Sequence, residues 1–132
     1  MNAPPPMTRI LVIDDDDLLR GALRIVLEGA GYEVMEAGDG EAGLAMHREH
    51  GADLVLVDIF MPERDGLEVI RELCSLSPQP RILAMSGGGQ TGQIEILKAA
   101  TALGASRALR KPFVPRDLLA AIHELLGAQR PP

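Results

Sequence analysis

The sequence predicts a doubly wound α/β domain, in which helices cover both faces of a five-stranded parallel sheet. Short apolar runs alternate along the chain with segments of helical periodicity, the order typical of parallel strands joined by crossover helices. The runs RILVI at 9–13 and DLVLVD at 53–58 are apolar at nearly every position, as expected of strands buried on both faces. With 132 residues, the chain has room for one such core.

The first strand, 9–13, ends at a run of four aspartates, and a helix follows. We expect Asp17 to cap this helix, because an aspartate side chain can accept the free backbone N–H groups of a first turn. The buried face of the helix is predicted from its spacing, and Gly29 and Gly31 close it. That face consists of Leu19, Ala22, Leu23, Val26 and Leu27.

The remaining elements repeat the pattern of strand and then helix. The second strand alternates over 32–37, and the helix after it, 41–49, offers Ala42, Leu44, Ala45 and Met46 for packing. The other expected strands are 53–58, 81–85 and 107–110, and the other expected helices are 67–76, about 93–103 and about 115–126.

The domain is expected to span residues 9–126. Residues 1–8 form a predicted flexible leader, because Pro4, Pro5 and Pro6 cannot donate ladder hydrogen bonds. Residues 127–132 form a short C-terminal tail, so we expect a stand-alone domain without an attached output domain.

Composition excludes several classes of function. The net charge of −6 disfavours direct binding to nucleic acid or to an anionic membrane, and the 2% aromatic content argues against base stacking. No apolar stretch reaches the ~20 residues of a membrane span. The single cysteine, Cys74, excludes an internal disulfide, and we expect a cytoplasmic protein.

Chemically active side chains follow four of the five strands. Asp14 and Asp15 follow the first strand, Asp58 ends the third, Ser86 follows the fourth and Lys111 the fifth. Ligands of open parallel sheets bind at the carboxyl ends of the strands, so we expect these groups to converge there. Converging carboxylates repel one another, and an oxygen-only site of this kind suits Mg²⁺, for which Mn²⁺ can substitute. A carboxylate at such a site can also serve as the nucleophile of phosphoryl transfer.

The motifs LVIDDDD, DLVLVDIFMPERDG, LAMS and LRKPF, in this order and spacing, resemble the receiver domain of bacterial two-component response regulators. The resemblance covers about residues 9–126 and implies the flavodoxin-like strand order 2-1-3-4-5. It also implies that Asp58 accepts the phosphoryl group. Asp14, Asp15, Asp58 and the backbone carbonyl of Phe60 match the metal ligands.

The resemblance further implies that Ser86, Gly87 and Lys111 bind the phosphoryl group, with a Lys111–Pro112 bond that is commonly cis. One departure from the family pattern concerns the output. Ala108 stands where receivers carry the aromatic residue of the switch, so we expect a different readout. Phe60 and Gly88 occupy positions that influence phosphoryl lifetime, and since neither can orient a water molecule, we expect slow self-dephosphorylation.

The function predicted from the sequence is that of a regulatory phosphoacceptor, which is not an enzyme but assists its own phosphorylation and dephosphorylation. The partner that donates the phosphoryl group would be a sensor histidine kinase or a histidine phosphotransfer protein, and the output would be a protein contact, with homodimerisation left open. Two alternatives remain. One is a phosphorylation-independent binding module with a degenerate site. The other is a Mg²⁺-dependent aspartyl-phosphate phosphatase, which Phe60 disfavours because such enzymes typically carry a second acid there.

Overall fold

The computed structural model describes residues 8–59, 66–86 and 93–127, and within them five strands form one parallel sheet. The strand order is β2-β1-β3-β4-β5, which confirms the predicted order. The strands are β1 (Arg9–Ile13), β2 (Glu33–Ala37), β3 (Leu54–Asp58), β4 (Arg81–Ser86) and β5 (Arg107–Arg110). The helices are α1 (Asp17–Gly29), α2 (Gly40–His50), α3 (Gly66–Cys74), α4 (Gln93–Leu103) and α5 (Pro115–Gly127).

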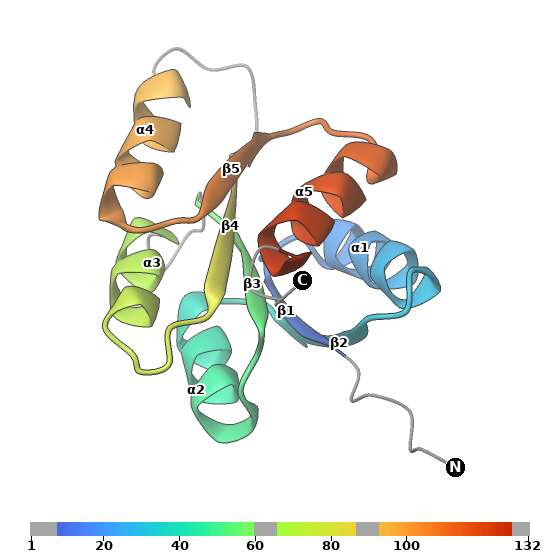
Figure 1. Cartoon of the computed structure of the whole chain (residues 1–132), viewed down its shortest axis with the longest axis horizontal. Helices are drawn as coiled ribbons and strands as arrows, with labels where there is room; N and C mark the ends of the chain where they lie inside the picture. Colours follow the sequence, from blue (N-terminus) through green and yellow to red (C-terminus); the bar gives the residue numbers. More distant parts are fainter. Residues whose placement is uncertain (1–7, 60–65, 87–92, 128–132) are drawn as a thin grey trace.

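The sheet separates two apolar layers. Helices α1 and α5 cover one face, and α2, α3 and α4 cover the other (Figure 1). Successive side chains of a strand point to opposite faces, so β1 sends Leu11 and Ile13 into one layer and Ile10 and Val12 into the other. This two-sided burial explains why the strands are apolar at consecutive positions.

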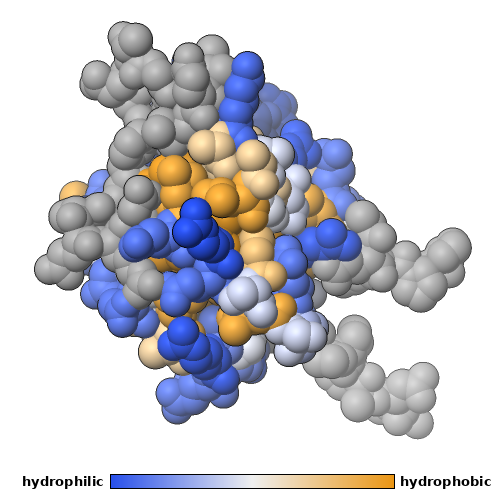
Figure 2. All heavy atoms as spheres, turned by 90° about the vertical axis from the view of Figure 1, so that its left-hand side faces the viewer, coloured by the Kyte–Doolittle hydropathy of each residue, from blue (hydrophilic) through white to orange (hydrophobic). Residues whose placement is uncertain are grey.

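The side of the molecule that carries α2, α3 and α4 has a mixed surface. Hydrophobic side chains gather toward the middle of this view, and hydrophilic ones lie around them (Figure 2). In the part of the chain that the structure describes, no helix combines the length and apolar character needed to cross a membrane.

Several sequence-based details were wrong at the level of single residues. Asp16, not Asp17, caps α1: its backbone is extended, and its side chain accepts the N–H groups of Leu18 and Leu19. Asp17 is instead the first residue of the helix. Ala22, Ala42 and Ala45 are exposed rather than packed. Ala22 lies at the edge of the buried face of α1, and Ala42 and Ala45 lie on the side of α2 opposite its buried residues. The bounds of β2, α2, β3, α3 and β4 also differ from the predicted ranges by one or two residues.

Candidate functional site

The turn after β1 places two aspartates in different environments. Asp14 is fully buried, and its backbone N–H donates to the carbonyl of Ala37 at 3.1 Å, which ties the end of β1 to β2. Its carboxylate Oδ1 accepts the backbone N–H of Asp16 at 2.9 Å. Asp15 is exposed, and its side chain makes no hydrogen bond or ion pair to another described residue. The turn thus anchors one carboxylate and leaves the next one open to solvent.

Asp58 lies at the last position of β3 and is 5% exposed. The chain beyond it stays close to the sheet, because the Ile59 N–H donates to the carbonyl of Met85 at 2.9 Å. Helix α3 then begins at Gly66, whose N–H donates to the Ile59 carbonyl at 2.9 Å. A Cβ at Gly66 would lie 2.5 Å from the Ile59 Cα, closer than real contacts allow. A glycine is therefore required where α3 starts beside Asp58.

Lys111 follows β5 and reaches both buried carboxylates. Its backbone N–H donates to the carbonyl of Ser86 at 2.7 Å, and the Lys111–Pro112 bond is cis, as the resemblance implied. The ammonium Nζ lies 3.1 Å from Asp14 Oδ2 and 3.5 Å from Asp58 Oδ2. The lysine thus ties the end of β5 to the ends of β1 and β3.

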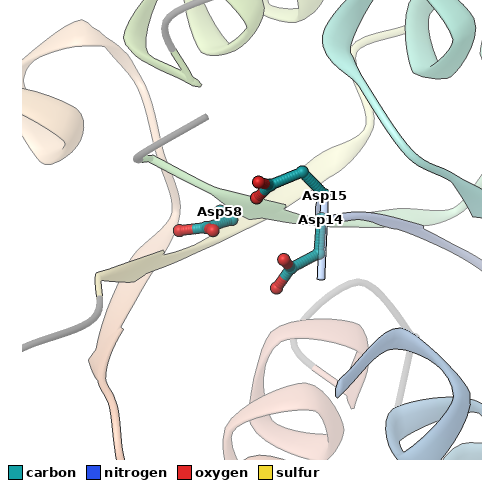
Figure 3. A group of neighbouring side chains, drawn as sticks. All are labelled: Asp14, Asp15 and Asp58. Atoms are coloured by element: carbon teal, nitrogen blue, oxygen red, sulfur yellow. The ribbon is translucent and has the colours of Figure 1, made fainter. Parts of the chain in front are cut away.

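The three carboxylates form one cluster. Asp14, Asp15 and Asp58 each offer an oxygen, and these oxygens lie within 4.8 Å of one another. Asp14 and Asp15 leave the end of β1 in different directions, with Asp58 beside them at the end of β3 (Figure 3). Among the residues that the structure describes, the Lys111 ammonium pairs with Asp14 and Asp58, and no cation pairs with Asp15, so the cluster is suited to a cation.

The other predicted site residues are described only in part. Ser86 ends β4 and is fully buried, and in the sheet register it lies opposite Arg110. Ala108 lies on β5, is half-buried and packs against the layer that includes Ala84 and Ala100. Phe60, Gly87 and Gly88 lie outside the described residues.

The sequence-based reasoning did not identify Arg20 as part of the site. This residue of α1 donates from Nη1 to the backbone carbonyl of Asp14 at 2.7 Å. It also pairs with Asp17 Oδ1 at 2.7 Å and with Glu36 Oε1 at 3.1 Å. A signal was available, since an arginine three residues after an aspartate on a helix predicts an ion pair between them.

Comparison with known proteins agrees with this arrangement. The family model of the response regulator receiver domain matches residues 10–123. The chemotaxis protein CheY of Thermotoga maritima is 34% identical over 119 residues, which cover 89% of this chain and 96% of that protein. The crystal structure of a CheY-like receiver domain protein from Methanospirillum hungatei has a TM-score of 0.86 at 32% identity, and the match covers 94% of this chain and 97% of that one.

Some relatives are longer proteins. The transcriptional regulatory protein ResD of Bacillus subtilis is 34% identical over 119 residues, which cover 90% of this chain but 48% of that protein. The chain therefore spans about half the length of this relative. The region that the family model matches, residues 10–123, contains the acidic cluster and Lys111. The chain belongs to the response regulator receiver domain family of two-component signalling proteins.

Proposed function

We propose that the chain accepts a phosphoryl group on Asp58 from the phosphohistidine of a sensor histidine kinase or a histidine phosphotransfer protein. The observation that carries this proposal is the convergence of three carboxylates and the Lys111 ammonium at the carboxyl edge of the sheet. Asp58 is the member of the cluster at the end of the central strand β3, where the family motif has its acceptor. Residues 9–126 form the proposed receiver unit, flanked by the leader 1–8 and the tail 127–132.

The donor set supports a divalent metal. Asp14, Asp15 and Asp58 offer only oxygen ligands, which Mg²⁺ prefers and Mn²⁺ also accepts. The backbone carbonyl of Phe60 is the fourth proposed ligand. When bound, the metal neutralises charge on the transferred group and on the carboxylates around it. The exposed position of Asp15 leaves the cluster accessible from solvent.

In the proposed transfer, a carboxylate oxygen of Asp58 attacks the phosphorus atom of the phosphohistidine. A new oxygen–phosphorus bond forms, the phosphorus–nitrogen bond breaks, and its electron pair returns to the imidazole of the donor. Lys111, whose Nζ is 3.5 Å from Asp58, pairs with the transferred phosphoryl oxygens. Ser86, the last residue of the neighbouring strand β4, and Gly87 supply hydrogen bonds to the same group.

The exposed face of α1 supports a protein as the donor. Leu18 is 87% exposed and Ile25 is 74% exposed, and with Ala22 they form an apolar stripe at spacings of four and three residues. Leu18 is three residues from Asp15, so the stripe begins beside the acidic cluster. A helical partner that packs on this stripe would have its own phosphohistidine within reach of Asp58.

The proposed output is a change in protein contacts, including homodimerisation, because the net charge of −6 disfavours direct contact with nucleic acid. Ala108 has no aromatic ring, so the inward rotation of an aromatic side chain at this position cannot transmit the phosphorylation signal. Because of Phe60 and Gly88, we expect slow loss of phosphate, so the phosphorylated form would persist after the donor has stopped supplying phosphoryl groups. Replacing Phe60 with Asn and Gly88 with Glu should shorten the half-life of the phosphorylated form; an unchanged half-life would refute this assignment.

The experiment that tests the proposed function is incubation with acetyl phosphate, with and without Mg²⁺, followed by intact-mass measurement. We expect one phosphate adduct that depends on Mg²⁺ and is absent in Asp58→Asn. Turnover of a small phosphate ester would favour the phosphatase, and no adduct with any donor or metal would favour the binding module. In a second arm, Leu18→Ser should slow transfer from a phosphohistidine protein while leaving the reaction with acetyl phosphate unchanged.

A further inference from the structure

Arg20 connects three elements beneath the acidic turn. Its side chain is 16% exposed and makes three contacts, one from each guanidinium nitrogen. Nη1 donates to the Asp14 carbonyl, Nη2 to Asp17 Oδ1 and Nε to Glu36 Oε1. The arginine therefore joins the end of β1, the first turn of α1 and strand β2.

We propose that Arg20 is a positioning residue for the metal site, which holds the turn from Asp14 to Asp17 in the shape that brings the Asp14 and Asp15 carboxylates to Asp58. This inference rests on the proposed function. Two of the bonds that fix Asp14 come from the turn and from α1: its side chain accepts the Asp16 N–H, and its main-chain carbonyl accepts Arg20 Nη1. A third bond, from the Arg20 N–H to the Asp16 carbonyl at 2.9 Å, closes the turn onto the helix.

The chemistry of the contacts requires a guanidinium. Its nitrogen atoms form a planar fork with fixed donor directions, so it can serve three acceptors at once. A lysine at this position would keep the charge but replace the fork with a single ammonium. Burial acts to lower the pKa of Arg20, and the hydrogen bonds and charges of Asp17 and Glu36 outweigh it, so the pKa is raised and the group stays charged.

Arg24 provides a matched control on the same helix. It lies one turn further along α1, and its Nη1 pairs with the second oxygen of Glu36 at 2.7 Å. Its Nε pairs with Glu28 at 3.1 Å. Within the described structure Arg24 has no bond to the turn from Asp14 to Asp17. Arg24→Gln thus removes one positive charge and one Glu36 pair without touching the acidic turn.

A positioning role and a purely electrostatic role of Arg20 predict opposite changes in metal affinity when the residue is replaced. Arg20 is a positive charge near a proposed cation site, so its removal should tighten metal binding if charge alone mattered. If Arg20 holds the ligands in place, its removal should weaken binding, and residues that orient metal ligands typically contribute about 10- to 100-fold in affinity.

The experiment is a titration of the full chain with Mn²⁺ alone, read by the electron paramagnetic resonance signal of the free ion. We expect Arg20→Gln and Arg20→Lys to weaken Mn²⁺ binding at least about tenfold. We expect Arg24→Gln to bind as the wild type does. Circular dichroism of each metal-free variant checks the fold, and Arg20→Lys serves if Arg20→Gln does not fold.

The outcomes that overturn the inference are distinct. Equal or tighter Mn²⁺ binding in Arg20→Gln would leave only an electrostatic role. If Arg24→Gln weakened Mn²⁺ binding as much as Arg20→Gln does, the effect would come from the general anchoring of α1 to β2. Both results leave the proposed function intact, whereas absent Mn²⁺ binding in the wild type would overturn the inference together with the proposed metal site.

Discussion

Asp15→Asn should stabilise the metal-free protein. The oxygens of the three clustered aspartates lie within 4.8 Å of one another, and Lys111 pairs with Asp14 and Asp58. Asp15 makes no ion pair with a described cation, so its charge adds repulsion without a matching attraction. The substitution keeps the size of the side chain and removes this charge.

The size of the effect follows from Coulomb's law. Two unit charges 4.8 Å apart repel by about 3.5 kcal/mol at an effective dielectric of ~20, and by about 1 kcal/mol in bulk water. Because Asp15 is exposed, the lower value applies more closely. We expect a gain of about 1 kcal/mol in the free energy of unfolding, which corresponds to a rise of roughly 3–5 °C in Tm for a domain of this size.

The assay is thermal unfolding in EDTA and again in excess Mg²⁺. A ligand at a hundred times its Kd stabilises the folded state by about 2.7 kcal/mol, so the wild type should gain stability with Mg²⁺. Asp15→Asn should start higher and gain much less. Glu49→Gln, an exposed carboxylate on α2, is the control and should follow the wild type. A destabilised Asp15→Asn in EDTA, or a full Mg²⁺ response in this variant, would refute the reasoning.

Three further predictions concern the support of the fold. Gly66→Ala should lower the free energy of unfolding by about 1–3 kcal/mol in a denaturant titration, because its Cβ meets the Ile59 backbone; Gly127→Ala, with open space around it, should not lower it. Asp16→Ala should cost about 1 kcal/mol as a lost helix cap, and equal loss in Asp17→Ala would contradict this assignment. Burial lowers the pKa of His47 from 6.5, and its Nδ1 accepts the Ala52 N–H, so the folded state favours the neutral ring. The unfolded chain therefore binds the proton first, and the contribution of His47 to stability should decrease as the pH falls below about 6.5; a denaturation midpoint in His47→Gln with the same pH dependence as the wild type would contradict it.

The sheet and the acidic cluster could be predicted from the sequence because each follows from a local pattern: runs of consecutive apolar residues for the strands, and polar residues at the strand ends for the cluster. Strands buried on both faces are apolar at consecutive positions, as in β1 and β3. Side chains that end parallel strands must meet at one edge, which is why Asp14, Asp58 and Lys111 were found before their distances were known.

The details that failed depend on backbone geometry and on contacts between distant elements. Each residue in a run of four aspartates has a side chain that can cap a helix. The extended backbone of Asp16 is what makes this residue the cap of α1. The role of Arg20 depends on Glu36, which strand pairing brings beside α1. The exposure of Ala22 was missed because, at the edge of the buried face of a helix, spacing alone does not separate a packed residue from an exposed one.

The central claim is that Asp58 carries the phosphoryl group. The most direct test is reductive trapping: the chain is phosphorylated with acetyl phosphate and Mg²⁺, treated with borohydride, digested and mapped by mass spectrometry. An acyl phosphate at Asp58 is reduced to homoserine, and we predict this conversion at Asp58 and not at Asp14 or Asp15. Homoserine at either of the other two aspartates, or a phosphate adduct that borohydride does not convert, would contradict the account.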